Sequence, residues 1–376
     1  MEFAPRLEKI CESATFKYSA LAKKEGVIDL TIGRTNFDTP KAIKDAAKRA
    51  LDEGRVNYTP TKGIAELREK IAEKLREENG ITGLDKESVI VSAGAKQLIF
   101  EAMMALVSEG DEVAIPDPSW VSYEALVNFA GGKVVWLPLF AEKGFIPDEN
   151  FLSALDNSHP KLILINSPNN PTGAVYPKKV LNRIADIAER KNAWLLSDEI
   201  YEKLIYEGEH FSPGSAYHKC ITVNGYSKEF SMTGWRLGYA ASKDKEIIEK
   251  MDLIQGQTVS CATSFVQYGA IAAYTKEARK ETTAMKEELR KRRDYLMGRL
   301  EKMDVLCRRP AGAFYAFPSF GDADDIKLAD RLIENGVAAI PGSPFGSKGA
   351  GCLRFSYGAS SMQQLEEAAN RIEKTI

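Results

Sequence analysis

Apolar residues between positions 88 and 242 form short continuous runs, and the segments between them have the spacing of amphipathic helices. Continuous apolar runs are typical of strands buried on both faces, as in a parallel sheet that helices cover. The pattern therefore predicts an α/β domain with a mostly parallel sheet and helices on both faces. The predicted strands are residues 88–91, 112–115, 133–137, 161–165, 193–197, 220–223 and 239–242.

The two ends of the chain predict a smaller α+β domain, and two further helices are expected between its N-terminal part and the sheet. Before the sheet, we expect an arm with one helix in 1–26, a strand at 27–32, a helix capped by Thr39 and Pro40 that runs to about 53, and a helix at 65–79 closed by Gly80. After a charged helical region at 243–300, we expect strands at 305–307, 312–317 and 352–356, with helices near 325–335 and 361–375.

The length of the chain also favours more than one domain, because 376 residues exceed the usual size of a single core. We predict an N-terminal arm and part of the small domain in residues 1–40. The large, cofactor-binding domain is predicted in 41–299, and the rest of the small domain in 300–376.

Composition excludes several classes of function. The net charge is -2 with both signs intermixed, so no basic patch indicates nucleic acid or a membrane surface. No segment resembles a signal peptide or a membrane span. The five scattered cysteines predict free thiols in a reducing, cytoplasmic setting. The three histidines lack metal-ligand spacing, so we expect no metal site and no Ser-His-Asp triad; they are His159, His210 and His218.

Three polar residues follow the ends of separate predicted strands. Asn170, Asp198 and Lys228 each lie just past such an end. Because the carboxyl ends of parallel strands share one edge of the sheet, we expect these side chains to converge. Lys228 has small neighbours and would suit an amine nucleophile; the alternative is an ordinary solvated lysine.

An aldehyde cofactor held by Lys228 would need further partners. Asp198 could keep a cofactor ring nitrogen protonated, or it could merely cap a helix through local backbone contacts. Gly94, Ala95 and Lys96 open a helix after a strand, where free backbone amides attract a phosphate. The hydroxyl of Ser227 and the guanidinium of Arg236 could complete that cradle, although Gly94 alone is also consistent with a simple tight turn.

A cation for a carboxylate substrate is predicted in the second domain. Arg354 lies on an otherwise apolar strand with no acidic neighbour in sequence. A buried arginine of this kind binds an anionic ligand or forms a structural salt bridge with a distant acid. The sequence leaves both readings open.

Taken together, these motifs resemble those of a known family, the fold-type I, class I pyridoxal-phosphate aminotransferases. Within that family the chain resembles the prokaryotic aspartate aminotransferases. The resemblance covers about residues 27 to 376. The motifs that carry it, in order, are Phe37–Pro40, Asn57-Tyr58 with Gly63 and Leu67-Arg68, Ala93–Gln97, Pro118–Tyr123, Asn166–Gly173, Ser197–Tyr201, Ser227–Gly238, Gly312–Tyr315 and Leu353–Ser356.

The resemblance implies a role for each matching residue. Lys228 is implied to bond pyridoxal 5'-phosphate and to shuttle protons. The implied ring contacts are Asp198 at the ring nitrogen, Tyr201 and Asn170 at the ring oxygen, and Trp120 on the ring face. The implied phosphate ligands are Gly94, Ala95, Ser227 and Arg236, with Tyr58 of a second subunit, so a homodimer with shared active sites is expected. Lys96 is also expected to bind the cofactor. The implied substrate contacts are Arg354 and the amide of Gly33, with Trp120 and Asn170 nearby.

Two residues bear on the substrate. Many similar proteins have Gly-Glu-Pro-Asp-Phe where this chain has Gly33 to Phe37, so Arg34 replaces an acid. Arg34 could alter side-chain preference, or it could pair with an acid and have no effect. In the similar proteins the lysine at Lys96 faces the distal carboxylate of acidic substrates. The expected reaction therefore moves an amino group from aspartate or another acidic amino acid to 2-oxoglutarate by ping-pong kinetics.

Other activities remain open from sequence. Aromatic or broad specificity is one alternative, and a β-lyase or cyclopropane-forming synthase on the same fold is another. A DNA-binding regulator is disfavoured, because the family motifs begin by about residue 27 and Lys228 is present.

Overall fold

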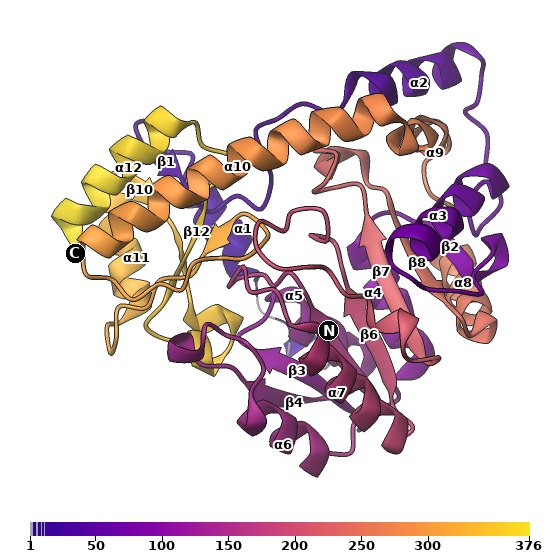
Figure 1. Ribbon diagram of the computed structural model, residues 1–376, viewed down its shortest axis with the longest axis horizontal. Coiled ribbons are helices and arrows are strands. Elements are labelled where there is room, and N and C mark those ends of the chain that lie inside the picture. Colours follow the sequence, from indigo (N-terminus) through magenta and orange to yellow (C-terminus); the bar gives the residue numbers. More distant parts are fainter. Residues whose placement is uncertain (1–2, 5–6, 9, 11) are drawn as a thin grey trace.

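The structure is a computed structural model that describes residues 3–4, 7–8, 10 and 12–376. Its centre is a seven-stranded sheet in the order β2-β8-β7-β6-β5-β3-β4 (Figure 1). Only β8 runs antiparallel to its neighbours, so the predicted, mostly parallel sheet is confirmed. The strands are β2 (Val89–Ser92), β3 (Glu112–Asp117), β4 (Lys133–Pro138), β5 (Leu162–Asn166), β6 (Trp194–Asp198), β7 (Cys220–Gly225) and β8 (Gly238–Ser242).

Helices cover both faces of this sheet, because alternate strand residues point to opposite sides. Leu162 and Leu164 of β5 pack in the core formed with α4, α5 and α8, whereas Ile163 and Ile165 pack in the core formed with α6 and α7. The helices are α4 (Ala95–Leu106), α5 (Ser122–Ala130), α6 (Glu149–Asn157), α7 (Lys178–Arg190) and α8 (Lys245–Thr258).

A smaller α+β domain combines both ends of the chain, as expected. The N-terminal β1 (Ile28–Asp29) pairs in parallel with the C-terminal β10 (Val337–Ala338), and they lie beside the yellow C-terminal helices (Figure 1). A second small sheet has the order β11-β12-β9. Its strands are β9 (Tyr315–Ala316), β11 (Ile340–Pro341) and β12 (Leu353–Ser356), and the helices of this part are α1 (Ala14–Leu21), α11 (Asp325–Glu334) and α12 (Met362–Thr375).

The remaining helices link the two parts. The long helix α10 (Lys276–Lys302) extends from α12 to α2 and runs across the predicted boundary between residues 299 and 300 (Figure 1). The predicted domain bounds stay a prediction. The other helices here are α2 (Lys41–Asp52), α3 (Ala65–Glu78) and α9 (Ser264–Ile271), and no described helix is long and apolar enough to cross a membrane.

Several local predictions were wrong. Thr39 does not cap α2: Pro40 occupies the cap position, and the Thr39 hydroxyl donates to the Ser231 carbonyl, 3.2 Å away. Residues 305–307 form one isolated bridge rather than a strand, and the strand expected at 27–32 is reduced to β1. The sequence analysis also did not find α6, β10 or β11. These short elements depend on distant partners that local pattern does not show.

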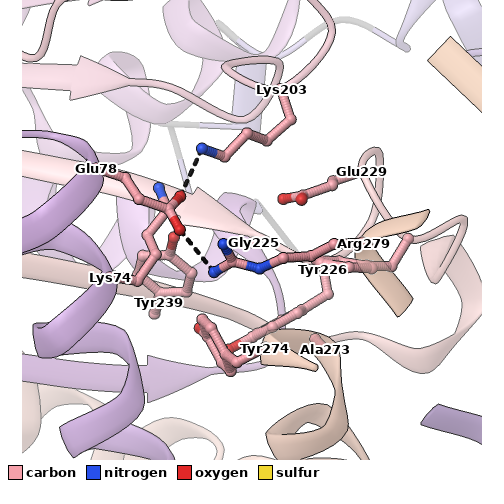
Figure 2. A pocket seen from close by; sticks show the side chains of 11 residues that line it. Lys74, Glu78, Lys203, Gly225, Tyr226, Glu229, Tyr239, Ala273, Tyr274 and Arg279 are labelled. Atoms are coloured by element: carbon pink, nitrogen blue, oxygen red, sulfur yellow. Dashed lines mark hydrogen bonds and ion pairs between the residues drawn. The ribbon is translucent and has the colours of Figure 1, made fainter. Parts of the chain in front are cut away.

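A group of charges lies beside α3, and its Lys74–Glu202 pair is buried. The Lys74 ammonium of α3 pairs with the Glu202 carboxylate, and each residue is at most 6% exposed. Figure 2 shows Glu78 between Lys203 and Arg279, at 2.6 Å from each cation. Burial alone would raise the pKa of Glu202, but the charges of Lys74, His210 and Lys203 lower it to about 2. Glu202 is therefore held ionised by its cationic neighbours.

We expect Lys74→Met to lower the free energy of unfolding by about 3–5 kcal/mol at pH 7, because Glu202 would remain buried without the cation that pairs with it most closely. The folded-state pKa of Glu202 is below its ordinary value of 4.5. Its stabilisation is therefore complete above about pH 4.5 and is lost as the pH falls toward 2. Chemical denaturation at pH 7 and at pH 3 measures both effects, and the difference between wild type and variant should shrink at pH 3.

Lys70→Met is the matched control, because Lys70 lies on the same helix in an exposed pair with Glu73. Exposed pairs contribute little to stability. The control should leave the free energy of unfolding nearly unchanged. Equal losses in the two variants would contradict a special role for the buried pair.

Candidate active site

A cavity of about 560 Å³ lies at the carboxyl ends of the central strands and extends to the small domain. Asn170, Asp198 and Lys228 all line it, which confirms their predicted convergence. Every other predicted site residue also lines it except Tyr58 and Gly94; these are Gly33, Arg34, Ala95, Lys96, Trp120, Tyr201, Ser227, Arg236 and Arg354. Both parts of the fold contribute, because Arg354 comes from β12 and Asp198 from β6.

Lys228 points into the cavity rather than to the outer solvent. Its Nζ donates a hydrogen bond to the Gly33 carbonyl oxygen, 2.6 Å away, and lies 5.9 Å from the ring centres of Tyr201 and Phe314. Burial, and then the positive charge of Arg354, lower the pKa of Lys228 to about 8. The amine is thus easier to deprotonate than an ordinary lysine.

Asp198 is 4% exposed at the end of β6. Its Oδ2 accepts a hydrogen bond from the Tyr123 hydroxyl at 2.6 Å, and its Oδ1 accepts one from the Ile200 amide at 3.2 Å. The bond from the Ile200 amide is the local backbone contact expected if Asp198 only caps a helix. It involves Oδ1 alone and leaves Oδ2 to Tyr123. Burial raises the pKa of Asp198 to about 6 despite these bonds. A nearby cation would stabilise this carboxylate.

Arg354 is 1% exposed and pairs with no carboxylate of the described chain, so the structural salt bridge is excluded within those residues. Its Nη1 donates to the Asn170 side-chain oxygen at 3.0 Å, and its Nη2 donates to the Thr31 carbonyl at 2.6 Å. The Tyr315 ring centre lies 4.6 Å from the guanidinium carbon. Nε is buried without a partner, so the guanidinium retains a free donor and its full charge.

The predicted phosphate cradle surrounds the start of α4. Gly94 has φ +93°, a backbone conformation that favours glycine, and a Cβ there would lie 2.5 Å from Nη2 of Arg236, so any side chain would displace this guanidinium. Arg236 itself has a left-handed backbone, with φ 54° and ψ 61°. A non-glycine residue holds that conformation at a cost of about 1–3 kcal/mol, often at functional sites. The Ser227 hydroxyl lines the cavity without a partner in the described chain.

Lys96 and Trp120 lie together on the cavity wall. The Lys96 ammonium lies 4.7 Å from the centre of the Trp120 ring. Burial, followed by repulsion from Arg236, lowers the pKa of Lys96. The side chain is therefore a partly desolvated cation that would gain from an anionic ligand.

The sequence analysis did not assign roles to several residues of this cavity. Tyr123 binds Asp198, and Tyr315 donates to or accepts from the Tyr201 hydroxyl at 2.9 Å. Both occur in motifs noted from sequence, but nothing local showed what they contact. Helix α1 was expected only as part of an arm, yet Phe16 and Ser19 line the cavity. Their spacing of three residues places them on one helix face, which was an available signal.

Tyr58 lies outside the cavity of its own chain and is 90% exposed. Its neighbour Val56 is 60% exposed, and the segment lies between α2 and α3 at the edge of the molecule (Figure 1). A single chain therefore does not bring Tyr58 to the other predicted site residues.

Among the described residues, one acid and histidine group has metal-ligand proximity. One ligand atom from each of Glu199, Glu202 and His210 lies within 4.8 Å of the others. The Lys74 ammonium already pairs with Glu202, and the His210 ring lies 2.8 Å from Glu199. These contacts describe an ion-pair network, and the expectation that the protein has no metal site stays a prediction.

Comparison with known proteins decides the family. The family described as aminotransferase class I and II matches residues 25–372. This chain is a member of that family. It is an aminotransferase with the α/β architecture predicted from sequence, and its resemblance to the fold-type I enzymes is confirmed.

Individual relatives agree along the whole chain. The aspartate/prephenate aminotransferase of Thermus thermophilus is 42% identical over 381 residues, which cover 99% of this chain and 98% of that one. The aromatic-amino-acid aminotransferase 2 of Thermococcus litoralis is 39% identical and covers 100% of this chain and 98% of its own. The structure of Thermus thermophilus aspartate aminotransferase with maleate superposes with a TM-score of 0.95 at 40% identity, with both chains fully covered.

Proposed function

We propose that this aminotransferase uses pyridoxal 5'-phosphate and moves the amino group of aspartate, or of another acidic amino acid, to 2-oxoglutarate by a ping-pong mechanism. The charge of the cavity is the observation that carries this proposal. Asp198 is the only carboxylate among its described lining residues, and five cations accompany it: Arg34, Lys96, Lys228, Arg236 and Arg354. A cavity with this excess of positive charge is suited to several anionic groups at once, namely a phosphate and two carboxylates.

The residues present fit the cofactor. Asp198 is a buried carboxyl that lacks a strong cationic partner, and a protonated ring nitrogen would supply one. Ser227 and Arg236, with the amides that begin α4, would hold the phosphate. Trp120 would cover one face of the ring, and Tyr201 and Asn170 would lie at its oxygen. Nζ of Lys228 would bond the aldehyde carbon.

When bound, pyridoxal 5'-phosphate supplies an electron sink for the electron pair that remains after the α-proton leaves. The chain itself moves the proton. The amino acid would replace Lys228 on the cofactor. The freed Nζ of Lys228 would then accept the α-proton and later return it. A pKa of about 8 favours this work, because a general base acts best with a pKa near the working pH.

The substrate carboxylates have separate partners in this proposal. Arg354 is buried, is fixed by Asn170, and has its Nε free, so it would bind the α-carboxylate beside Gly33. Lys96 would face the distal carboxylate. Arg34 lines the same cavity and has no ion pair or hydrogen bond from its side chain to the described chain, so its positive charge is available to the substrate. The relative solved with maleate, a dicarboxylate, supports this reading.

A half-reaction screen tests the substrate class. The holoenzyme is mixed with single amino acids, and the loss of its visible absorption band is followed. Aspartate and glutamate should react fastest. Lys96→Ala should slow aspartate by roughly 10- to 100-fold, because it removes one charged hydrogen bond. The rate with alanine should hold, because alanine has no distal carboxylate.

The same screen separates the alternatives. Reaction with tyrosine or phenylalanine at least as fast as with aspartate would assign an aromatic specificity, which the Thermococcus litoralis relative illustrates. Steady turnover without any 2-oxo acid would assign a lyase or synthase. Arg34→Ala should slow aspartate and glutamate more than alanine; an equal change for all three would remove Arg34 from substrate recognition.

The proposed active enzyme is a cytoplasmic homodimer. A second copy would cover the exposed Val56 and Tyr58 and bring Tyr58 to the phosphate of its neighbour. The described cysteines are all free, which suits a reducing compartment; they are Cys220, Cys261, Cys307 and Cys352, and Cys11 lies outside the described residues.

A further inference from the structure

A buried glutamine, Gln267, holds the segment that carries Tyr58. It bonds Thr59, the residue that follows Tyr58. Gln267 of α9 is 0% exposed. Its side-chain amide donates to the Thr59 hydroxyl oxygen at 2.9 Å and to the Ala262 carbonyl at 2.8 Å. Its side-chain oxygen accepts a hydrogen bond from the Ile64 amide at 2.9 Å. One side chain thus ties both ends of the stretch 59–64 to the helix α9.

A second buried glutamine holds the middle of this stretch. Gln255 of α8 is also 0% exposed, and its amide donates to the Thr61 carbonyl and, at 3.0 Å, to the Val91 carbonyl. The Val91 amide in turn donates to the Lys62 carbonyl at 2.9 Å. Gly63 has φ +96°, and an added Cβ would lie 2.8 Å from the Cβ atom of Val91. The backbone at Gly63 therefore packs in direct contact with β2.

This anchoring stops where exposure begins. Thr59 is half-buried and bonded to Gln267, whereas Tyr58 is 90% exposed and Val56 is 60% exposed. Burying the Gln267 amide is unfavourable unless its hydrogen bonds are made, and two of those bonds go to this one short connection. Gln255 bonds the connection through its NH2 group only, because its side-chain oxygen is buried without a partner. The arrangement fixes the base of an exposed aromatic side chain while leaving its ring uncovered by its own chain.

We propose that Gln267, through the Thr59 hydroxyl, is a positioning residue that sets the Tyr58 side chain for the cofactor site of the partner subunit. This inference rests on the proposed function, which supplies the cofactor and the homodimer. Gln255 bonds the Thr61 carbonyl, so the backbone that follows Tyr58 is fixed at a second point. Tyr58 then reaches the neighbouring phosphate with little loss of freedom on binding.

Thr59→Val tests the contact directly. Valine keeps the shape of threonine but removes the acceptor for the Gln267 amide, together with the longer, exposed bond that the Thr59 hydroxyl donates to the Pro60 carbonyl at 3.3 Å. Release of pyridoxal 5'-phosphate should become roughly tenfold faster, as expected for one lost hydrogen bond. Thr61→Val is the matched control, because the Thr61 side chain makes no hydrogen bond with the described chain. Thr59→Val leaves one amide hydrogen of the buried Gln267 without an acceptor, so its Tm should fall by a few degrees. The control should keep both the Tm and the cofactor retention of the wild type.

Hybrid dimers show whether Thr59→Val speeds cofactor release from the site of its own subunit or from that of the partner subunit. In the first hybrid, one chain carries Thr59→Val and the other carries Lys228→Ala. In the second hybrid, one chain carries both changes and the other is wild type. The visible band of the lysine-bound cofactor reports only the site with an intact Lys228. We expect wild-type retention in the first hybrid and tenfold faster release in the second.

Each outcome has a distinct meaning. Faster release in the first hybrid, or in neither, would overturn the positioning role while leaving the cofactor site intact. Equal acceleration by Thr61→Val would reduce the contact to general stability of the segment and would also overturn the proposal. A wild-type protein that forms no band with pyridoxal 5'-phosphate, or that remains monomeric in gel filtration, would instead refute the proposed function.

Discussion

Replacement of Lys228 by alanine should lower the rate of transamination by roughly 10⁴-fold or more, because one side chain is assigned both the bond to the cofactor and the proton transfer. Its Nζ is the cavity amine with a pKa of about 8, and it lies 2.6 Å from the Gly33 carbonyl oxygen. Single-turnover kinetics with aspartate measures the loss. Borohydride reduction of the wild-type holoenzyme, followed by peptide mass spectrometry, should place the cofactor adduct on Lys228.

Lys250→Ala is the control for this experiment, because Lys250 is an exposed lysine of α8 that does not line the cavity. It should react as wild type does. An adduct on any lysine other than Lys228, or a Lys228→Ala protein with near-normal turnover, would overturn the assignment of the whole site. The pH dependence adds a second check: labelling of the apoenzyme amine by an aldehyde should rise with pH and be half complete near pH 8.

Arg354→Lys should lower kcat/KM for every amino acid by about 100-fold, which corresponds to roughly 2.7 kcal/mol at a tenfold change per 1.36 kcal/mol. Lysine keeps the charge but cannot present two parallel donors to a carboxylate or retain the bond to Asn170. The loss should be similar for aspartate and alanine, because both carry the same α-carboxylate. Steady-state kinetics with both substrates measures it.

Arg183→Lys provides the matched control at an exposed ion pair with Glu149 and should leave kcat/KM unchanged. A loss confined to aspartate would move Arg354 from the α-carboxylate to the distal one. Unchanged kinetics for both amino acids would show that the buried guanidinium serves the fold alone.

Most of the sheet could be predicted from sequence because its strands are buried on both faces. Such strands leave a continuous apolar signal that does not depend on which strand is the neighbour, as at Leu162–Asn166. Short strands were predicted less well: the strand expected at 27–32 is only Ile28–Asp29, and its partner Val337–Ala338 was not predicted, because the two strands depend on pairing with each other across the chain. Thr39 shows the same limit, since its hydroxyl bonds a distant carbonyl instead of its own helix.

The layered fold, and the position of Asn170, Asp198 and Lys228 at one edge of its sheet, could be predicted from sequence alone. These follow from strand periodicity and from the shared direction of parallel strands. Three contacts required the three-dimensional structure: Arg354 has no acidic partner among the described residues, Tyr123 bonds Asp198, and Gln267 bonds Thr59. Such contacts join residues far apart in sequence, and their geometry depends on packing that local pattern does not encode.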